Sequence, residues 1–114
     1  MSDAPSVERR QVTVIVVTYQ SGDVVGDCLR SIPAAFAGLP APCVVVVDNA
    51  STDSTATEVA TAAPDVLFHR LADNLGYAAA INAGLEVSTD RSGGAVGPVL
   101  VLNPDIRLQA GRSE

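Results

Sequence analysis

The side chains best suited to chemistry lie in short polar clusters that directly follow apolar runs. Thr18 and Tyr19 form the first cluster, and Asp48 and Asn49 begin the second. The carboxylate of Asp48 can accept a hydrogen bond from a nucleobase N–H or a ribose hydroxyl. The ring of Tyr19 offers an apolar surface on which a base can pack. Together these residue types indicate recognition of a nucleotide.

A third cluster, Asn103-Pro104-Asp105, places a carboxylate next to an amide oxygen on a tight turn. Hard oxygen donors of this kind suit Mg²⁺ or Mn²⁺, which typically takes one or two carboxylates together with substrate phosphates. Simpler interpretations stay open. Asp48 and Asp105 could be turn residues, Tyr19 could pack against its neighbours, and Asp53 fits the cap of a helix.

Four apolar runs are expected to position these clusters. Residues 12–17, 44–47 and 99–102 are apolar at nearly every position, as strands of a parallel sheet covered on both faces require. Residues 66–71 form a weaker run that fits an edge strand. Because ligands bind outside the carboxyl ends of the strands in open α/β sheets, all three clusters fall on the side where a site is expected.

A helical pattern separates the first two runs. Ser21 or Gly22 could cap this helix, and Pro33 is expected to end or bend it. One face carries an apolar stripe with the spacing of a buried helix face: Val25, Cys28, Leu29 and Ile32.

Two more helices are expected further along the chain. The second covers about residues 53–63, where Thr55 and Glu58 fit a capping box and Pro64 follows as a stop. The third, rich in alanine, covers about residues 76–87. The resulting order, β-α-β-α-β-α-β, predicts an α/β fold with an open, mostly parallel sheet.

Composition narrows the class of protein. The 114 residues are 47% hydrophobic and 18% charged, which is typical of one ordered domain. The net charge is −6, and seven scattered arginines with no lysine argue against a nucleic-acid partner. No apolar run approaches the roughly 20 residues of a transmembrane segment. Residues 1–10 fit a flexible polar leader without a signal peptide, so the expected location is cytoplasmic, with or without peripheral attachment to the inner face of the membrane.

Several known site types are excluded by their motifs. The chain has no G-x-G-x-x-G after the first run, and without lysine it has no P-loop. The two cysteines, fifteen residues apart, form neither a disulfide framework nor a zinc site. A receiver domain would need an acidic pair after the first run and a later lysine, and both are missing. His69 has no metal-ligand spacing around it, whereas Arg70 lies near a strand end and could reach a diphosphate.

Four segments, in order, resemble family 2 glycosyltransferases of the GT-A fold. They are residues 14–19, 46–53, 74–84 and 100–105, and the resemblance spans about residues 12–111. It implies that residues 11–114 form the N-terminal, nucleotide-sugar-binding part of a truncated, Rossmann-like GT-A domain. The Asn-Pro-Asp cluster is similar to that of rhamnosyltransferase-like members, which use UDP- or dTDP-linked sugars.

The resemblance also implies roles for the matched residues. Thr18 and Tyr19 would line the base pocket, Asp48 would bond to the pyrimidine ring, and residues 74–84 would approach the diphosphate and sugar, with Gly76 allowing close backbone contact. Asp105 would bind Mg²⁺ or Mn²⁺. The residues expected to bind the nucleotide sugar are Thr18, Tyr19, Asp48, Asn49, Asn74, Gly76, Tyr77, Asn82 and Asn103.

The sequence departs from the family pattern in two places. Asn103 stands where family metal motifs often carry an aspartate, which leaves one carboxylate. The chain ends nine residues after Asp105, before the acceptor-binding half and the catalytic base, so no catalytic residue is assigned. The expected function is donor binding for glycosyl transfer to a glycan or lipid acceptor. The alternative is an inactive nucleotide-binding module or a truncated remnant.

Overall fold

The computed structural model describes residues 11–91 and 97–109, which form seven elements. The leader expected over residues 1–10 lies outside the described residues. In chain order the elements are β1 (Thr13–Thr18), α1 (Val25–Ala35), β2 (Cys43–Asp48), α2 (Thr55–Ala62), β3 (Leu67–Arg70), α3 (Tyr77–Arg91) and β4 (Val99–Leu102). The predicted β-α-β-α-β-α-β order is confirmed.

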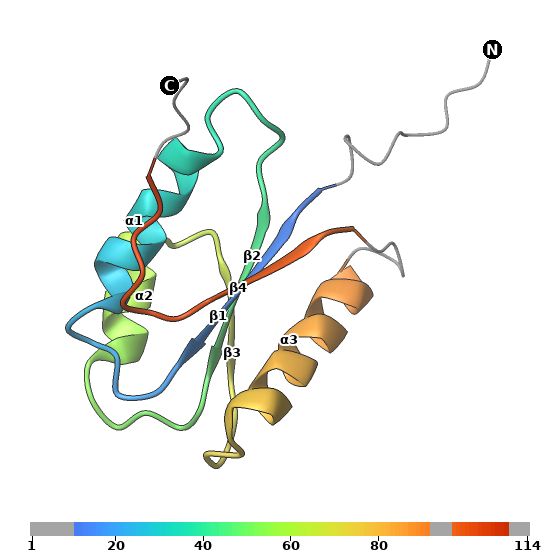
Figure 1. Cartoon of the computed structure of the whole chain (residues 1–114). Coiled ribbons are helices and arrows are strands. Elements are labelled where there is room, and N and C mark those ends of the chain that lie inside the picture. Colours follow the sequence, from blue (N-terminus) through green and yellow to red (C-terminus); the bar gives the residue numbers. More distant parts are fainter. Residues whose placement is uncertain (1–10, 92–96, 110–114) are drawn as a thin grey trace.

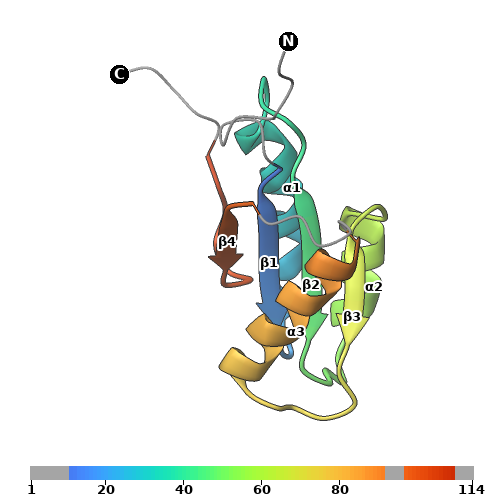
Figure 2. The same cartoon turned by 90° about the vertical axis from the view of Figure 1, so that its right-hand side faces the viewer.

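The four strands form one parallel sheet in the order β3-β2-β1-β4, which is seen edge-on in Figure 1 and face-on in Figure 2. The chain moves outward from β1 through β2 to β3, which lies at an edge as expected, and then returns to place β4 on the other side of β1. The topological switch point therefore lies between β1 and β4, which is where open α/β sheets bind ligands. Thr18 pairs with Asp48 and Asp48 with Arg70, so three strands end at the same level.

Helices cover both faces of the sheet, as Figure 2 shows: α1 and α2 lie behind it and α3 lies in front. Alternate residues of β1 face the two layers, with Val14 and Val16 in the core under α1 and α2, and Ile15 and Val17 in the core under α3. Burial of each such side chain contributes about 1.5–3 kcal/mol. The two central strands are therefore the most strongly held part of the fold.

The first helix begins and ends differently from the prediction. Its N-cap is Val24, without a side-chain cap, because the Ser21 hydroxyl is engaged with Tyr19 while the Ser21 carbonyl accepts the first helical N–H groups. Pro33 does not end the helix, which runs to Ala35. A proline this close to the end removes only one of the last backbone hydrogen bonds, so the helix tolerates it.

The other two helices also differ in detail. The capping box expected of Thr55 and Glu58 is absent, since Ser54 is the N-cap and makes no side-chain cap. Asp53 instead accepts the Thr55 N–H at 3.0 Å, which is the capping role open to it from sequence. Helix α3 extends to Arg91, four residues beyond the prediction. In the described part of the chain, no helix is long and apolar enough to cross a membrane.

Candidate functional site

The carboxyl ends of β1 and β2 meet in a buried polar cluster around Asp48. The hydroxyls of Thr18 and Ser51 each donate to Asp48 Oδ1 at 2.6 Å, and the Ser51 N–H donates to Oδ2 at 2.8 Å. Asp48 is only 1% exposed. A carboxylate can be buried at this position because its hydrogen bonds replace those of water. Asp48 therefore fixes the end of β1 and the loop after β2 as one unit.

Asn49 joins this unit to the segment before α3. It is 3% exposed, its Oδ1 accepts the Leu75 N–H at 3.1 Å, and its Nδ2 donates to the Gly76 carbonyl at 3.3 Å. Gly76 has φ +92° and open space where a side chain would stand, so it is needed for its backbone conformation. Asn74 accepts the Gly76 N–H at 2.9 Å and closes this turn.

Exposed aromatic rings flank the same edge of the sheet. Tyr19, directly after β1, is 54% exposed, and Tyr77, the first residue of α3, is 51% exposed. Leu75, two residues before Tyr77, is also exposed. Asn82 lies exposed on α3. These apolar side chains are available to a flat ligand, since the interior does not enclose them.

The third cluster follows β4, beside β1. Asn103 and Asp105 are exposed, and the Asn103 carbonyl accepts the Ile106 N–H at 3.0 Å. The chain then runs along α1 (Figure 1), where the Leu108 N–H donates to Ser31 Oγ at 2.9 Å. Burial, with a smaller contribution from the Asp105 charge, raises the pKa of the Cys28 thiol to about 11. The Cys28 thiol also lies 3.9 Å from the Asn103 carbonyl oxygen, so this turn stands close to the beginning of α1.

The structure brings together part of the predicted set. Thr18, Asp48 and Asn49 are in one bonded cluster, and Asn49 reaches the backbone of Gly76. Within the described residues, Asn103 and Asp105 share no hydrogen bond with that cluster, and no three His, Cys, Asp or Glu side chains gather as a metal site. His69 is exposed on β3.

Sequence reasoning missed the structural roles of three residues at the carboxyl ends of the strands. Ser51 supplies two of the bonds to Asp48, and Gln20 joins the two loops. Arg70, considered only as a possible diphosphate contact, donates from Nη2 to the Ser51 carbonyl at 2.9 Å. The available signal was that these polar residues stand at or near strand ends. Ser51 bonds to Asp48 three residues away, but the partners of Gln20 and Arg70 lie 19 to 33 residues away.

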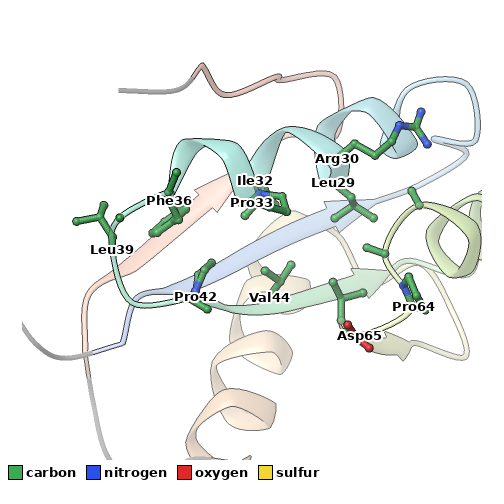
Figure 3. A pocket seen from close by; sticks show the side chains of 16 residues that line it. Leu29, Arg30, Ile32, Pro33, Phe36, Leu39, Pro42, Val44, Pro64 and Asp65 are labelled. Atoms are coloured by element: carbon green, nitrogen blue, oxygen red, sulfur yellow. The ribbon is translucent and has the colours of Figure 1, made fainter. Parts of the chain in front are cut away.

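A mostly apolar hollow lies at the opposite end of the strands, away from these clusters (Figure 3). It has a volume of about 610 Å³ and lies between the end of α1, the start of β2 and the segment after α2. Arg30 and Asp65 are the charged residues of its lining, which is otherwise mostly apolar. None of the predicted site residues lines this hollow, so the carboxyl ends of the strands remain the candidate site.

The sequence matches a known protein family over most of its length. The profile of the family described as glycosyl transferase family 2 matches residues 13–107. No curated protein sequence matches the chain significantly. The solved structure of S. aureus TarS 1–349 is similar, with a TM-score of 0.70 and 27% identity over 88% of this chain and 29% of that chain.

Two ligand complexes are also similar. S. aureus TarS 1–349 in complex with UDP has a TM-score of 0.65 and 27% identity, over 84% of this chain and 28% of that chain. The mannosyltransferase PcManGT from Pyrobaculum calidifontis, in complex with GDP-Man and Mn²⁺, has a TM-score of 0.62 and 32% identity, over 90% of this chain and 30% of that one. This chain spans less than a third of the length of these proteins.

The predicted Rossmann-like, GT-A type of α/β fold is confirmed by these similarities and by the parallel sheet. The family match covers most of the chain and includes all three polar clusters. The chain therefore belongs to glycosyl transferase family 2.

Proposed function

We propose that this chain binds the nucleoside diphosphate sugar of a family 2 glycosyltransferase, with UDP or dTDP as the nucleotide and a glycan or lipid as the acceptor of the sugar. One observation carries the proposal. At the switch point of the sheet, a hydrogen-bonded loop presents the exposed ring of Tyr19, and the turn after β4 presents the exposed carboxylate of Asp105. These are a surface for a base and a ligand for a cation.

The base would lie against Tyr19, with Thr18 and Asp48 beneath it. Three of the roughly four acceptor positions of the Asp48 carboxylate are already used by Thr18 and Ser51. One position remains for a base N–H. Direct contact between Asp48 and the base therefore stays a prediction, whereas its role in holding the loops follows from its bonds.

The diphosphate and sugar would lie toward the start of α3. Asn74, Gly76, Tyr77 and Asn82 are in this region, and the first N–H groups of a helix attract anions. The guanidinium of Arg70 is held on the Ser51 carbonyl in the neighbouring loop. These positions support the assignment of the segment to the anionic part of the donor.

The residues after β4 fit a site in which the protein and the donor phosphates would bind a divalent cation together. Asp105 offers one exposed carboxylate and Asn103 an amide oxygen, and the described residues gather no larger set of ligands. Mg²⁺ and Mn²⁺ accept such a site when phosphate oxygens and water complete it. When bound, the cation would offset negative charge on the nucleoside diphosphate. The relatives solved with UDP and with GDP-Man and Mn²⁺ support this part of the proposal.

A calorimetric titration with UDP, dTDP and GDP, each with and without Mn²⁺, tests the proposal. We expect one pyrimidine nucleotide to bind, and Mn²⁺ to tighten its binding about tenfold or more, because Asp105 would hold the cation and the cation would offset the charge of the diphosphate. Asp105→Ala should remove the Mn²⁺ effect. Asp65→Ala, an exposed aspartate at the opposite end of the strands, is the matched control and should leave it intact. A folded chain that binds none of the three nucleotides contradicts the proposal.

A second function, nucleotide binding without turnover, is favoured by the state of Asp48. This carboxylate is 1% exposed and its oxygens hold the loops through Thr18 and Ser51, so we assign it no role as a general base. We therefore expect the chain by itself to bind the donor without transferring sugar. Transfer of label from a nucleotide sugar to an added acceptor by the pure chain would contradict this.

A further inference from the structure

The β1–α1 loop and the β2–α2 loop are joined by the side chain of Gln20. Its Oε1 accepts the backbone N–H groups of Thr52 at 2.6 Å and Asp53 at 3.2 Å, and its Nε2 donates to Thr52 Oγ1 at 3.1 Å. The Gln20 N–H in turn donates to Ser51 Oγ at 2.7 Å. One residue thus bonds to three consecutive positions of the opposite loop, 31 to 33 residues away in sequence.

The backbone at this junction adopts an uncommon conformation. Gln20 has φ +51° and Ala50, in the facing loop, has φ +62°. Among the described residues these are the only non-glycine positions in the left-handed region. Such a conformation is unfavourable for a side chain other than glycine, so the surrounding bonds must hold it. Strain of this kind is concentrated at functional sites.

Tyr19 is held through both of its chain neighbours. Thr18 on one side is tied to Asp48, and Gln20 on the other is tied to residues 51–53. The Tyr19 N–H also donates to Ser21 Oγ at 3.1 Å. The exposed ring therefore projects from a backbone that cannot turn freely, although no interior contact encloses the ring itself.

We propose that Gln20 is a positioning residue: its amide locks the β1–α1 loop to the β2–α2 loop and so sets the orientation in which the Tyr19 ring meets the nucleotide base. This rests on the proposed function. A ring fixed before binding loses less freedom when the base arrives, so the lock raises affinity without touching the ligand. Gln20 acts through Tyr19 and is not itself assigned a ligand contact.

Gln20→Gly is the sharpest variant because it removes the amide while relieving the positive φ. Other ties between the loops remain, including the Gly22 N–H to Asp53 Oδ2 at 3.0 Å and the Ser21 N–H to Thr55 Oγ1 at 2.9 Å. The variant is therefore expected to fold. Gln20→Ala keeps the φ penalty and should be less stable than Gln20→Gly.

Affinity for UDP is measured by calorimetry at a temperature where every variant is fully folded. We expect Gln20→Gly to weaken binding about tenfold. Gln11→Ala is the matched control, because Gln11 also donates from its amide to a distant backbone carbonyl, that of Ala41 at the opposite end of the strands. It should bind UDP like the unaltered chain.

A double-mutant cycle separates positioning from general support. In a Tyr19→Ala background, Gln20→Gly should have no further effect on UDP affinity, because the ring through which it acts is gone. An equal tenfold loss in both backgrounds would overturn the proposal. So would unaltered binding by Gln20→Gly in the presence of Tyr19.

A measurement without ligand distinguishes this proposal from the proposed function. In a Tyr77→Phe background Tyr19 is the one remaining tyrosine, and its near-ultraviolet circular dichroism reports how rigidly the ring is held. Gln20→Gly should reduce this signal and Gln11→Ala should not. An unchanged signal would overturn the positioning role even if UDP binds. A reduced signal with no nucleotide binding by the unaltered chain would uphold the lock on Tyr19 while contradicting the proposed function.

Discussion

Asp48 and Asp105 both lie at the carboxyl ends of the strands, but one is buried and the other is exposed. Asp48 ends a central strand, is almost fully buried and accepts three hydrogen bonds from Thr18 and Ser51. Asp105 follows the edge strand β4 on an exposed turn, which packs on α1 through other residues. One carboxylate is committed to the protein, and the other is free for a ligand.

This difference in burial suits the two carboxylates to different roles. A buried carboxylate with satisfied oxygens fixes the loops around it, so the surface above it is formed before a ligand arrives. An exposed carboxylate remains hydrated and can exchange water for a cation. Two aspartates that look equivalent in sequence, each after an apolar run, are thus a structural residue and a candidate ligand.

The largest expected effect is the loss of stability when the buried aspartate, and not the exposed one, is replaced. Asp48→Ala should lower the free energy of unfolding by about 3 kcal/mol, because the buried donors of Thr18 and Ser51 lose their acceptor. Asp105→Ala should change it by no more than about 0.5 kcal/mol, as for other exposed residues. Urea unfolding of the two variants beside the unaltered chain measures both values. Equal losses would break the comparison.

A smaller effect is expected at alkaline pH through Cys28, which lies beneath the Asp105 turn. The pKa of its thiol is raised from 9.0 to about 11, mainly by burial and further by the Asp105 charge. A raised pKa stabilises the fold below pH 9, and this stability is lost as pH rises toward 11. We expect a loss of roughly 1–2 kcal/mol across this window, measured by urea unfolding.

Variants identify the source of the alkaline effect. Cys28→Ala should flatten the pH dependence, whereas Cys43→Ala, the other free cysteine, should not. Asp105→Ala should lower the pKa of Cys28 while leaving it above 9.0, since burial is the larger cause. Titration of the thiol by its ultraviolet absorbance measures this shift. An unchanged Cys28 pKa in Asp105→Ala would mean that the turn lies further from α1.

The smallest expected effect sharpens the account of Asp48. Thr18→Val keeps the side-chain shape but removes one donor, and should cost about 1 kcal/mol in unfolding free energy. Thr13→Val is the matched control at the other end of β1, where the hydroxyl bonds to the neutral Ser88 at 2.9 Å. Hydrogen bonds to ionised groups are stronger, so the Thr18 variant should lose more. A larger loss from Thr13→Val would contradict the assigned role of the carboxylate.

The fold class was predictable because its signals are local. Residues 12–17, 44–47 and 99–102 are apolar on both faces, and the structure places a strand in each. The alternation of β1 residues between the two cores follows from the pleat of a strand. The end points of the helices were less predictable. The Ser21 hydroxyl bonds to the nearby Tyr19 carbonyl, and the Thr55 hydroxyl accepts the Ser21 N–H from another loop, so neither caps a helix as expected.

The sequence predicted which residues follow the strands, but not which of their side chains are buried or which residues they bond to. Sequence indicated that Asp48, Asn49 and Asp105 follow strands, but each could equally have faced solvent or interior. Burial of Asp48 depends on hydroxyls from Thr18 and Ser51, and that of Asn49 on the backbone near Gly76. The importance of Gln20 was invisible, because its partners come from another loop.

The sequence by itself determined the order of the elements, the apolar faces, the positions of the polar clusters and the family. These properties follow from side-chain type and spacing along one stretch of chain. Only the tertiary structure decided that β4 returns beside β1, that Asp48 is enclosed while Asp105 is exposed, and that Gln20 bonds to the loop after β2. Each of these depends on contacts between residues far apart in the chain, whose free energy exists only once the sheet has formed.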